Sequence, residues 1–233
     1  HYTVNLSSRK VNYWGYTGGF YYAPKASFSA KASKHNGVYC DYTTEFKDMV
    51  KALHRAGIEV IMEMFFNDKS TGFILQCVEY WVTEYHIDGF RFDLMGLHDV
   101  KTMNDIRSTL DKISPKMPVY GEGWAMGTKN DLTDYDGESV QMASQGSTSK
   151  LDSRVGMFND QYRDAVKGRY SSIGAKGYIQ GNLVGTAKGV RYGVRANTAG
   201  SSVNWKAYSP AQCVNYVSCH DNNTLYDKLW GSV

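Results

Sequence analysis

Hydrophobic and polar residues follow helix-like and strand-like patterns in turn from residue 43 onward. Three segments carry an apolar residue at every third or fourth position, which predicts helices. The first helix is expected to begin at residues 43–45, with an acid in its first turn, and to stop at Gly57. The three apolar faces are Phe46, Met49, Val50 and Leu53; Phe73, Cys77, Trp81 and Tyr85; and Val100, Met103, Ile106, Leu110 and Ile113.

Short apolar runs next to these helices predict strands at residues 58–66, 89–94 and 118–122. The runs recur about every 30 residues, which is the length of a strand–helix–strand unit with a right-handed crossover. Such units build a parallel sheet that is either doubly wound or closed into a barrel. The predicted fold class is therefore α/β.

The remaining segments are less regular. The Tyr-, Gly- and Ser-rich beginning predicts loops with short strands at most, and no internal repeat or domain linker is recognisable. Strands are expected at residues 155–158 and 214–218 and a short helix at 161–167, whereas 168–212 is rich in glycine and has little periodicity. We expect one domain with three parts. Residues 1–42 are rich in loops, residues 43–124 contain regular βα units, and residues 125–233 contain looser ones.

The composition of the 233 residues is that of a folded globular chain. With 42% hydrophobic and 14% aromatic residues, disorder is excluded. A net charge of +3, scattered along the chain, does not indicate nucleic acid, and no run reaches the ~18 apolar residues of a membrane span. No signal peptide is recognisable. The sequence leaves the cellular compartment undecided, with the cytoplasm favoured. The four cysteines are scattered along the chain, and we expect free thiols at Cys40, Cys77, Cys213 and Cys219. The alternative is two disulfides, which four cysteines can form in three different pairings.

Three acids stand at the ends of predicted strands: Asp93, Glu122 and Asp221. The carboxyl ends of parallel strands share one face of the sheet, so these side chains are expected to converge there. Glycoside hydrolysis uses two acids, one to protonate the leaving oxygen and one to attack or to activate water. A third carboxylate stabilises positive charge in the transition state. The alternative is that each acid only caps the helix that follows its strand.

Five stretches, in order along nearly the whole chain, resemble type I pullulanases, debranching enzymes of the alpha-amylase superfamily (glycoside hydrolase family 13). Residues 89–99 (GFRFDLMGLHD), 120–124 (YGEGW) and 215–227 (NYVSCHDNNTLYD) are similar to the second, third and fourth signature regions of that family. Residues 12–16 (NYWGY) and 156–168 (GMFNDQYRDAVKG) resemble two further segments. The resemblance implies a partial (β/α)8 barrel that contains the third to the seventh family strands.

The resemblance also implies roles for the three acids. Asp93 would be the nucleophile, Glu122 the general acid and base, and Asp221 the carboxylate that stabilises the transition state and holds sugar hydroxyls. Arg91 would face the same side of its strand as Asp93, keeping that carboxylate ionised and oriented. The alternative for Arg91 is an ion pair that only stabilises the fold.

Four further residues are implied to bind substrate. His220 would hydrogen-bond the sugar at the cleavage site, and Trp14, Tyr16 and Trp124 would present ring faces to sugars. Taken alone, a histidine is more often structural, and aromatic residues are more often part of a core.

The first signature region departs from the family pattern. Its aspartate is replaced by Glu63 and its histidine by Asp68, while Asn67 is kept. An acid at residue 68 would add negative charge near the nucleophile and raise carboxylate pKa values. In addition, residues 69–73 join the third family strand almost directly to the next helix, so the domain B excursion that forms one wall of the cleft is reduced. Both changes predict an altered subsite.

The leading hypothesis is a retaining hydrolase that cleaves α-1,6 branch linkages in pullulan, glycogen or starch oligosaccharides. A non-catalytic or weakly active α-glucan-binding protein, or another α-glucanase or transglycosylase of the superfamily, remains open. The expected partner is an α-glucan, with no nucleic acid and no membrane span. No cofactor is required, although Asn67 matches a position near calcium in some amylases.

The motif order also bears on length. A (β/α)8 barrel needs about 250 residues, and here the first clear strand matches the third of the family and the last matches the seventh. We therefore expect missing barrel strands and accessory domains in the full-length protein. Exposed strand edges would then make residues 1–233 poorly active in isolation.

Overall fold

A computed structural model describes residues 4–5, 10–11, 16, 19–30, 41–66, 69–126, 140–199 and 205–233. The chain divides into two compact units. The first unit contains His1–Arg91 and Thr109–Met117, and the second contains Phe92–Ser108 and Pro118–Val233.

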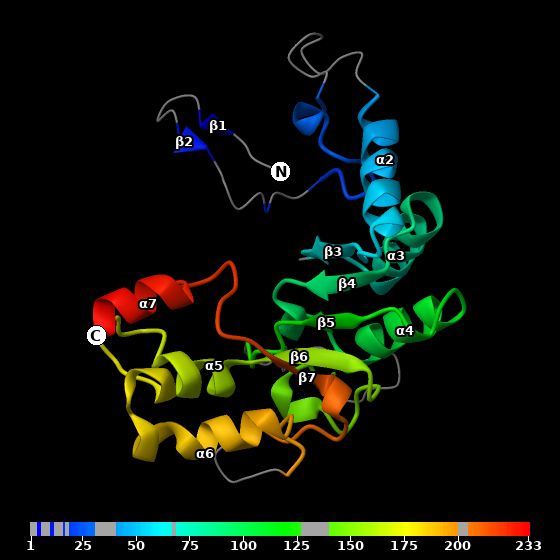
Figure 1. Ribbon diagram of the computed structural model, residues 1–233. Coiled ribbons are helices and arrows are strands. Elements are labelled where there is room, and N and C mark those ends of the chain that lie inside the picture. The colour runs from blue at the N-terminus through cyan, green and yellow to red at the C-terminus, as the bar shows by residue number, and fades with distance from the viewer. Residues whose placement is uncertain are drawn as a thin grey trace. The chain divides into compact units, whose positions relative to one another are not determined.

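The first unit begins with short elements and continues with regular ones (Figure 1). The elements are β1 (Val4–Asn5), which pairs antiparallel with β2 (Lys10–Val11); the 3-10 turn η1 (Ala26–Phe28); α2 (Tyr42–Arg55); β3 (Ile61–Met64); α3 (Thr71–Tyr85); and β4 (Gly89–Phe92), whose last residue belongs to the second unit.

Helix α2 begins one residue before the expected start. The side chain of Asp41 accepts a hydrogen bond from the Thr44 N–H at 2.9 Å, so Asp41 is the N-cap. Gly57, with φ +74°, follows the end of the helix as predicted.

Helix α3 confirms the predicted apolar face, because Ile74, Cys77, Val78, Trp81, Val82 and Tyr85 are buried. The Trp81 indole donates to the Tyr21 carbonyl at 2.8 Å, which attaches residues 19–30 to this helix. Residues 65–70 join β3 to α3, which confirms the reduced excursion.

The strands form a five-stranded sheet in the order β3-β4-β5-β6-β7. Strands β5 (Val119–Gly121), β6 (Val155–Asn159) and β7 (Cys213–Asn215) pair parallel, with Gly121 opposite Met157 and Met157 opposite Cys213. The α/β class and the parallel sheet are confirmed. Strand β3 begins later than predicted, because the Asp88 carboxylate accepts the Val60 N–H at 2.6 Å, which takes that donor out of strand pairing; the strand also ends at Met64, before the predicted residue 66.

The second unit carries most of the remaining helices. They are the 3-10 turns η2 (Met95–Leu97), η3 (Gln145–Ser147), η4 (Tyr178–Gln180) and η5 (Pro210–Gln212), and the helices α4 (Val100–Asp111), which continues into the first unit, α5 (Asp160–Lys167), α6 (Leu183–Val194) and α7 (Leu225–Ser232). Helix α4 buries Met103, Ile106 and Leu110 as predicted, but it ends before Ile113, which is 43% exposed.

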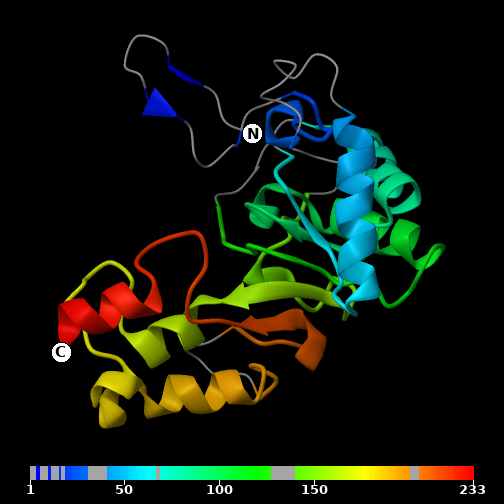
Figure 2. The same cartoon turned by 45° about the horizontal axis from the view of Figure 1, so that its top comes forward.

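Helix α6 lies in the segment where little periodicity was found, and it packs beside α5 (Figures 1 and 2). Its glycines recur every fourth residue. A Cβ atom at Gly193 would lie 2.1 Å from the Tyr162 ring, and one at Gly189 would lie 2.7 Å from the Ala165 Cβ. Glycine disfavours a helix in isolation, but here it permits the two helices to approach closely.

The last helix, α7, was not expected from the sequence. The Thr224 side chain caps it by accepting the Asp227 N–H at 3.2 Å. Cys77, Cys213 and Cys219 are free thiols, as expected, and Cys40 lies outside the described residues. Among the described helices, none combines the length and apolarity needed to cross a membrane.

Candidate active site

Asp93 and Glu122 each directly follow a strand of the sheet, and both are buried, at 6% and 3% exposed. Hydrogen bonds connect the two segments: the Glu122 N–H donates to the Phe92 carbonyl at 3.1 Å, and the Gly96 N–H donates to the Glu122 carbonyl at 2.9 Å. The backbone therefore fixes the two acids relative to each other.

The Glu122 carboxylate also has a defined orientation. Its Oε2 accepts the Leu94 N–H at 3.0 Å. Leu94 adopts a left-handed conformation with φ +48°, which is unfavourable for a residue with a Cβ atom. Strain of this kind persists where the surrounding structure demands it, and here it directs a backbone donor toward Glu122.

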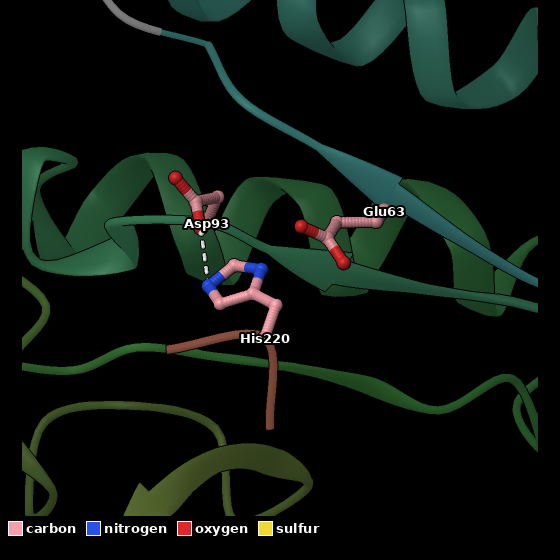
Figure 3. Close-up of side chains that lie close together, drawn as sticks. All are labelled: Glu63, Asp93 and His220. Carbon is pink, nitrogen blue, oxygen red and sulfur yellow. Dashed lines mark ion pairs between the residues drawn. The ribbon is translucent and has the colours of Figure 1, made fainter. Parts of the chain in front are cut away.

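His220 brings the three acids together. Its Nε2 lies 3.5 Å from Asp93 Oδ1, 3.6 Å from Glu122 Oε1 and 3.9 Å from Asp221 Oδ2. Figure 3 shows the His220 ring and Asp93, with the ion pair between them dashed. The side chains of Asp93 and Glu122 are 8% and 3% exposed, against 51% for Asp221. All four residues belong to the second unit, so the predicted convergence of the acids is present within one compact body.

Glu122, His220 and Asp221 offer ligand atoms within 4.8 Å of one another, a spacing that could hold a metal ion. Asn67, the residue behind the calcium hypothesis, lies outside the described residues.

A cavity of about 460 Å³ opens beside two of the acids. This volume is within the range of small-molecule sites, about 300–1,000 Å³. Aromatic rings and polar groups share its walls, which include Glu122, Trp124, Phe158, Asp160, Arg163, Tyr170, Tyr216 and Asp221. Trp124 thus lies at the site as predicted, whereas a contact with sugar stays a prediction.

The first unit holds Tyr16 and Arg91, two of the site residues predicted from the sequence. The Tyr16 hydroxyl donates to Glu63 Oε1, and the buried Arg91 donates to the same oxygen through Nη1 at 3.1 Å. Glu63, also labelled in Figure 3, is on β3. The residue that replaces the family aspartate is therefore a shared acceptor for Tyr16 and Arg91. Trp14 and Asp68 lie outside the described residues.

Most residues of the cavity wall were not predicted from the sequence, among them Gln145, Arg163 and Tyr170. Arg163 is 6% exposed and its guanidinium carbon lies 4.9 Å from the centroid of the Tyr170 ring. Arg163 belongs to the 156–168 stretch, so the resemblance pointed to its segment without indicating its contact. Gln145 donates to Asp160 Oδ1 at 3.0 Å from a region with no recognisable motif.

Burial changes the pKa values of two groups near the cavity. It raises the pKa of the Tyr216 phenol above its ordinary value, because the phenolate would be desolvated. It lowers the pKa of Lys167, mainly because the charged amine is desolvated.

Asp93 and Glu122 thus lie at the carboxyl ends of strands in an α/β fold, the face that carries the site in barrels and in doubly wound sheets alike. No protein-family model matches the chain. Pullulanase of Bacillus subtilis (strain 168) is 31% identical over 93% of this chain and 34% of its own length. Isoamylase SU1 of Zea mays, a chloroplastic protein, is 31% identical over 39% of this chain and 17% of its own length.

Solved structures agree with these relatives. A pullulanase of Paenibacillus barengoltzii, crystallised with maltohexaose and α-cyclodextrin, matches with a TM-score of 0.82 and 34% identity over 94% of this chain and 38% of its own. Type I pullulanase of Bacillus subtilis, crystallised with maltose, gives a TM-score of 0.75 and 29% identity over 93% of this chain and 34% of its own. The chain is a homologue of the pullulanases and isoamylases, the debranching enzymes of glycoside hydrolase family 13. It spans about a third of the length of the pullulanase of Bacillus subtilis.

Proposed function

We propose that the protein is a retaining glycoside hydrolase that cleaves α-1,6 branch linkages in α-glucans such as pullulan, glycogen and starch oligosaccharides. The observation that carries this proposal is the convergence of Asp93, Glu122 and Asp221 on the Nε2 atom of His220. Two buried acids and one exposed acid surround one imidazole ring. Together they provide the carboxyl groups that glycoside hydrolysis requires.

In the proposed mechanism, the Asp93 carboxylate attacks the anomeric carbon while Glu122 gives its proton to the leaving oxygen. The glycosidic bond breaks and a covalent glycosyl ester forms on Asp93. Glu122, now a carboxylate, takes a proton from water, and the resulting hydroxide displaces Asp93. Two inversions at one carbon give retention of configuration.

The contacts of Glu122 support its role as the acid. Its Oε2 accepts a backbone N–H, whereas its Oε1 faces His220. Oε1 is therefore the oxygen that exchanges the proton. Asp221, at 51% exposure, stays free to meet sugar hydroxyls and developing positive charge.

The substrate class is supported by the cavity and by the relatives. Trp124 and Tyr216 line the cavity next to Glu122, and flat aromatic faces suit the apolar face of a pyranose. The pullulanase of Paenibacillus barengoltzii was crystallised with maltohexaose and α-cyclodextrin, both α-glucans. The proposed chemistry uses side chains and water, and no step requires a cofactor.

Release of reducing ends from pullulan tests the proposal, with Glu122→Gln as the control. Release by the full-length wild-type protein well above the same protein with Glu122→Gln supports it, and release equal to the control refutes it. The short β3–α3 connection leaves one alternative, an α-glucan-binding protein without turnover. Calorimetry with maltooligosaccharides would identify such a protein by binding without hydrolysis. A transglycosylase, the other alternative, would be identified by products longer than the substrate.

A further inference from the structure

Helix α5 carries two buried cations, one helical turn apart. Arg163 is 6% exposed and Lys167 is 1% exposed. Burying a positive charge is unfavourable unless the group is fully hydrogen-bonded. The partners of both side chains therefore indicate what this helix is built to hold.

Both cations bind the loop that carries His220 and Asp221, here called the β7–α7 loop (residues 216–224). The Arg163 Nη1 donates to the Tyr216 hydroxyl at 2.8 Å, and the Lys167 Nζ donates to the Asn223 carbonyl at 2.7 Å. Tyr216 and Asn223 lie near the two ends of the loop, on either side of His220 and Asp221.

The two anchors have different characters. The guanidinium of Arg163 lies 5.6 Å from the Tyr216 ring centroid, and its Nε donates to Asp164 Oδ1 at 2.7 Å, so its orientation is fixed from two sides. Lys167 makes a charge-assisted bond to a backbone carbonyl, which holds the main chain of the loop at Asn223 itself.

Other contacts of the loop lie at single points along it. The Tyr216 ring packs against Phe158 with centroids 4.9 Å apart, and the Ser218 Oγ accepts the Leu225 N–H at 2.8 Å, which closes the loop onto the start of α7. Catalytic groups must be held to within about 0.5 Å of their productive positions, and loops hold them less well than helices or strands do. A loop that carries two site residues therefore needs an external support.

We infer that Arg163 and Lys167 are positioning residues, which clamp the β7–α7 loop so that His220 and Asp221 face Glu122 and Asp93. This inference rests on the proposed function for its catalytic consequence, but the clamp itself is a claim about structure. Neither cation needs to touch substrate for this role, although Arg163 also lines the cavity.

Kinetics with pullulan test the consequence. Arg163→Met and Lys167→Met keep much of the side-chain volume but remove the donors. We expect kcat to fall about 10- to 100-fold, the effect of a misplacement of about 1 Å, with a smaller change in KM. Arg163→Lys should recover part of the loss, because an ammonium group can still donate to Tyr216. The matched controls are Arg191→Met and Lys188→Met on α6, both exposed, which should leave kcat unchanged.

Thiol labelling tests the clamp without relying on activity. Cys219 lies inside the loop, whereas Cys213 is on β7 and Cys77 is fully buried in α3. Alkylation with iodoacetamide, followed by peptide mass spectrometry, gives a rate for each thiol. In Arg163→Met and Lys167→Met we expect Cys219 to react several-fold faster than in the wild type, with the other two rates unchanged.

Two results would overturn the inference. One is an unchanged kcat together with an unchanged Cys219 rate, and the other is an equal acceleration of all three thiols, which reports general unfolding. If the wild-type protein releases no sugar from pullulan, the proposed function fails, and the labelling rates alone then decide on the clamp.

Discussion

Replacing Glu122 with Gln removes the proposed acid with little change in shape. The amide oxygen of glutamine can accept the Leu94 N–H, as Glu122 Oε2 does at 3.0 Å, and the amide nitrogen takes the place of Oε1 beside His220. The backbone bonds of residue 122 to Phe92 and Gly96 remain. The variant is therefore expected to fold like the wild type.

The size of the effect should depend on the leaving group. A sugar hydroxyl is a poor leaving group, and general acid catalysis contributes about 10²- to 10⁴-fold. For pullulan we expect kcat of Glu122→Gln to fall by about 10³-fold, which corresponds to about 4 kcal/mol in the barrier. The acidic phenol of an aryl α-maltoside can leave without being protonated. The first step with this substrate should therefore be nearly unaffected by the substitution.

The assay compares steady-state hydrolysis of pullulan with the burst of phenol from the aryl maltoside, using circular dichroism to confirm that both proteins are folded. Equal losses on the two substrates would refute the role of Glu122 as the acid, because the variant would then have lost binding or structure instead. A loss smaller than tenfold on pullulan would refute it as well.

Three other predictions concern packing, pH and binding. Gly193→Ala should lower the free energy of unfolding by about 1–3 kcal/mol in urea titration, because its Cβ would lie 2.1 Å from the Tyr162 ring, whereas Gly72→Ala, with nothing within 4 Å, should be neutral or stabilising. The pKa of the Cys77 thiol is raised from 9.0 to about 12 by burial, so only the unfolded chain ionises at pH 10. The stability advantage of the wild type over Cys77→Ala should therefore shrink by about 1.4 kcal/mol between pH 8 and pH 10, and a constant difference would contradict this. Trp124→Ala should raise the KM for pullulan about tenfold or more, the loss of one ring contact, and an unchanged KM would remove Trp124 from the binding site.

The regular helices could be predicted because their burial follows from local spacing. Helix α3 buries the face that the sequence indicates, since one side of it packs and the other meets solvent. Helix α6 could not be predicted in this way, because its packing surface consists of glycines, whose role appears only when Tyr162 and Ala165 of the neighbouring helix are in place. The later start of β3 likewise depends on Asp88, which is distant in sequence.

The candidate site shows the same division. Asp93 and Glu122 were recognisable by their place directly after a strand, as the rule for parallel sheets predicts. For Asp221 the prediction was wrong in detail, because β7 ends at Asn215 instead of residue 218 and Asp221 lies in the loop that follows. The resemblance placed His220 at the cleavage site, but its contacts with the three acids were not predictable, since they depend on how the β7–α7 loop is held. Arg163 and Lys167 were part of a recognised stretch, but their partners lie about 50 residues further along the chain.

The pairing of Arg91 with Glu63 is a further case. From its strand position, Arg91 was expected to serve the nucleophile, and the structure shows a bond to Glu63 at 3.1 Å. The longer side chain of glutamate, compared with the family aspartate, reaches both Arg91 and Tyr16. The role of Arg91 toward Asp93 remains a prediction.

The most direct test of the proposed mechanism is the configuration of the first product. Proton NMR during the first minutes of pullulan hydrolysis distinguishes the α-anomer from the β-anomer of the released reducing end before mutarotation mixes them. With Asp93 as the nucleophile and Glu122 as the acid and base, the first product is the α-anomer. A β-anomer formed first would show a single inversion by water and would contradict the assignment of Asp93.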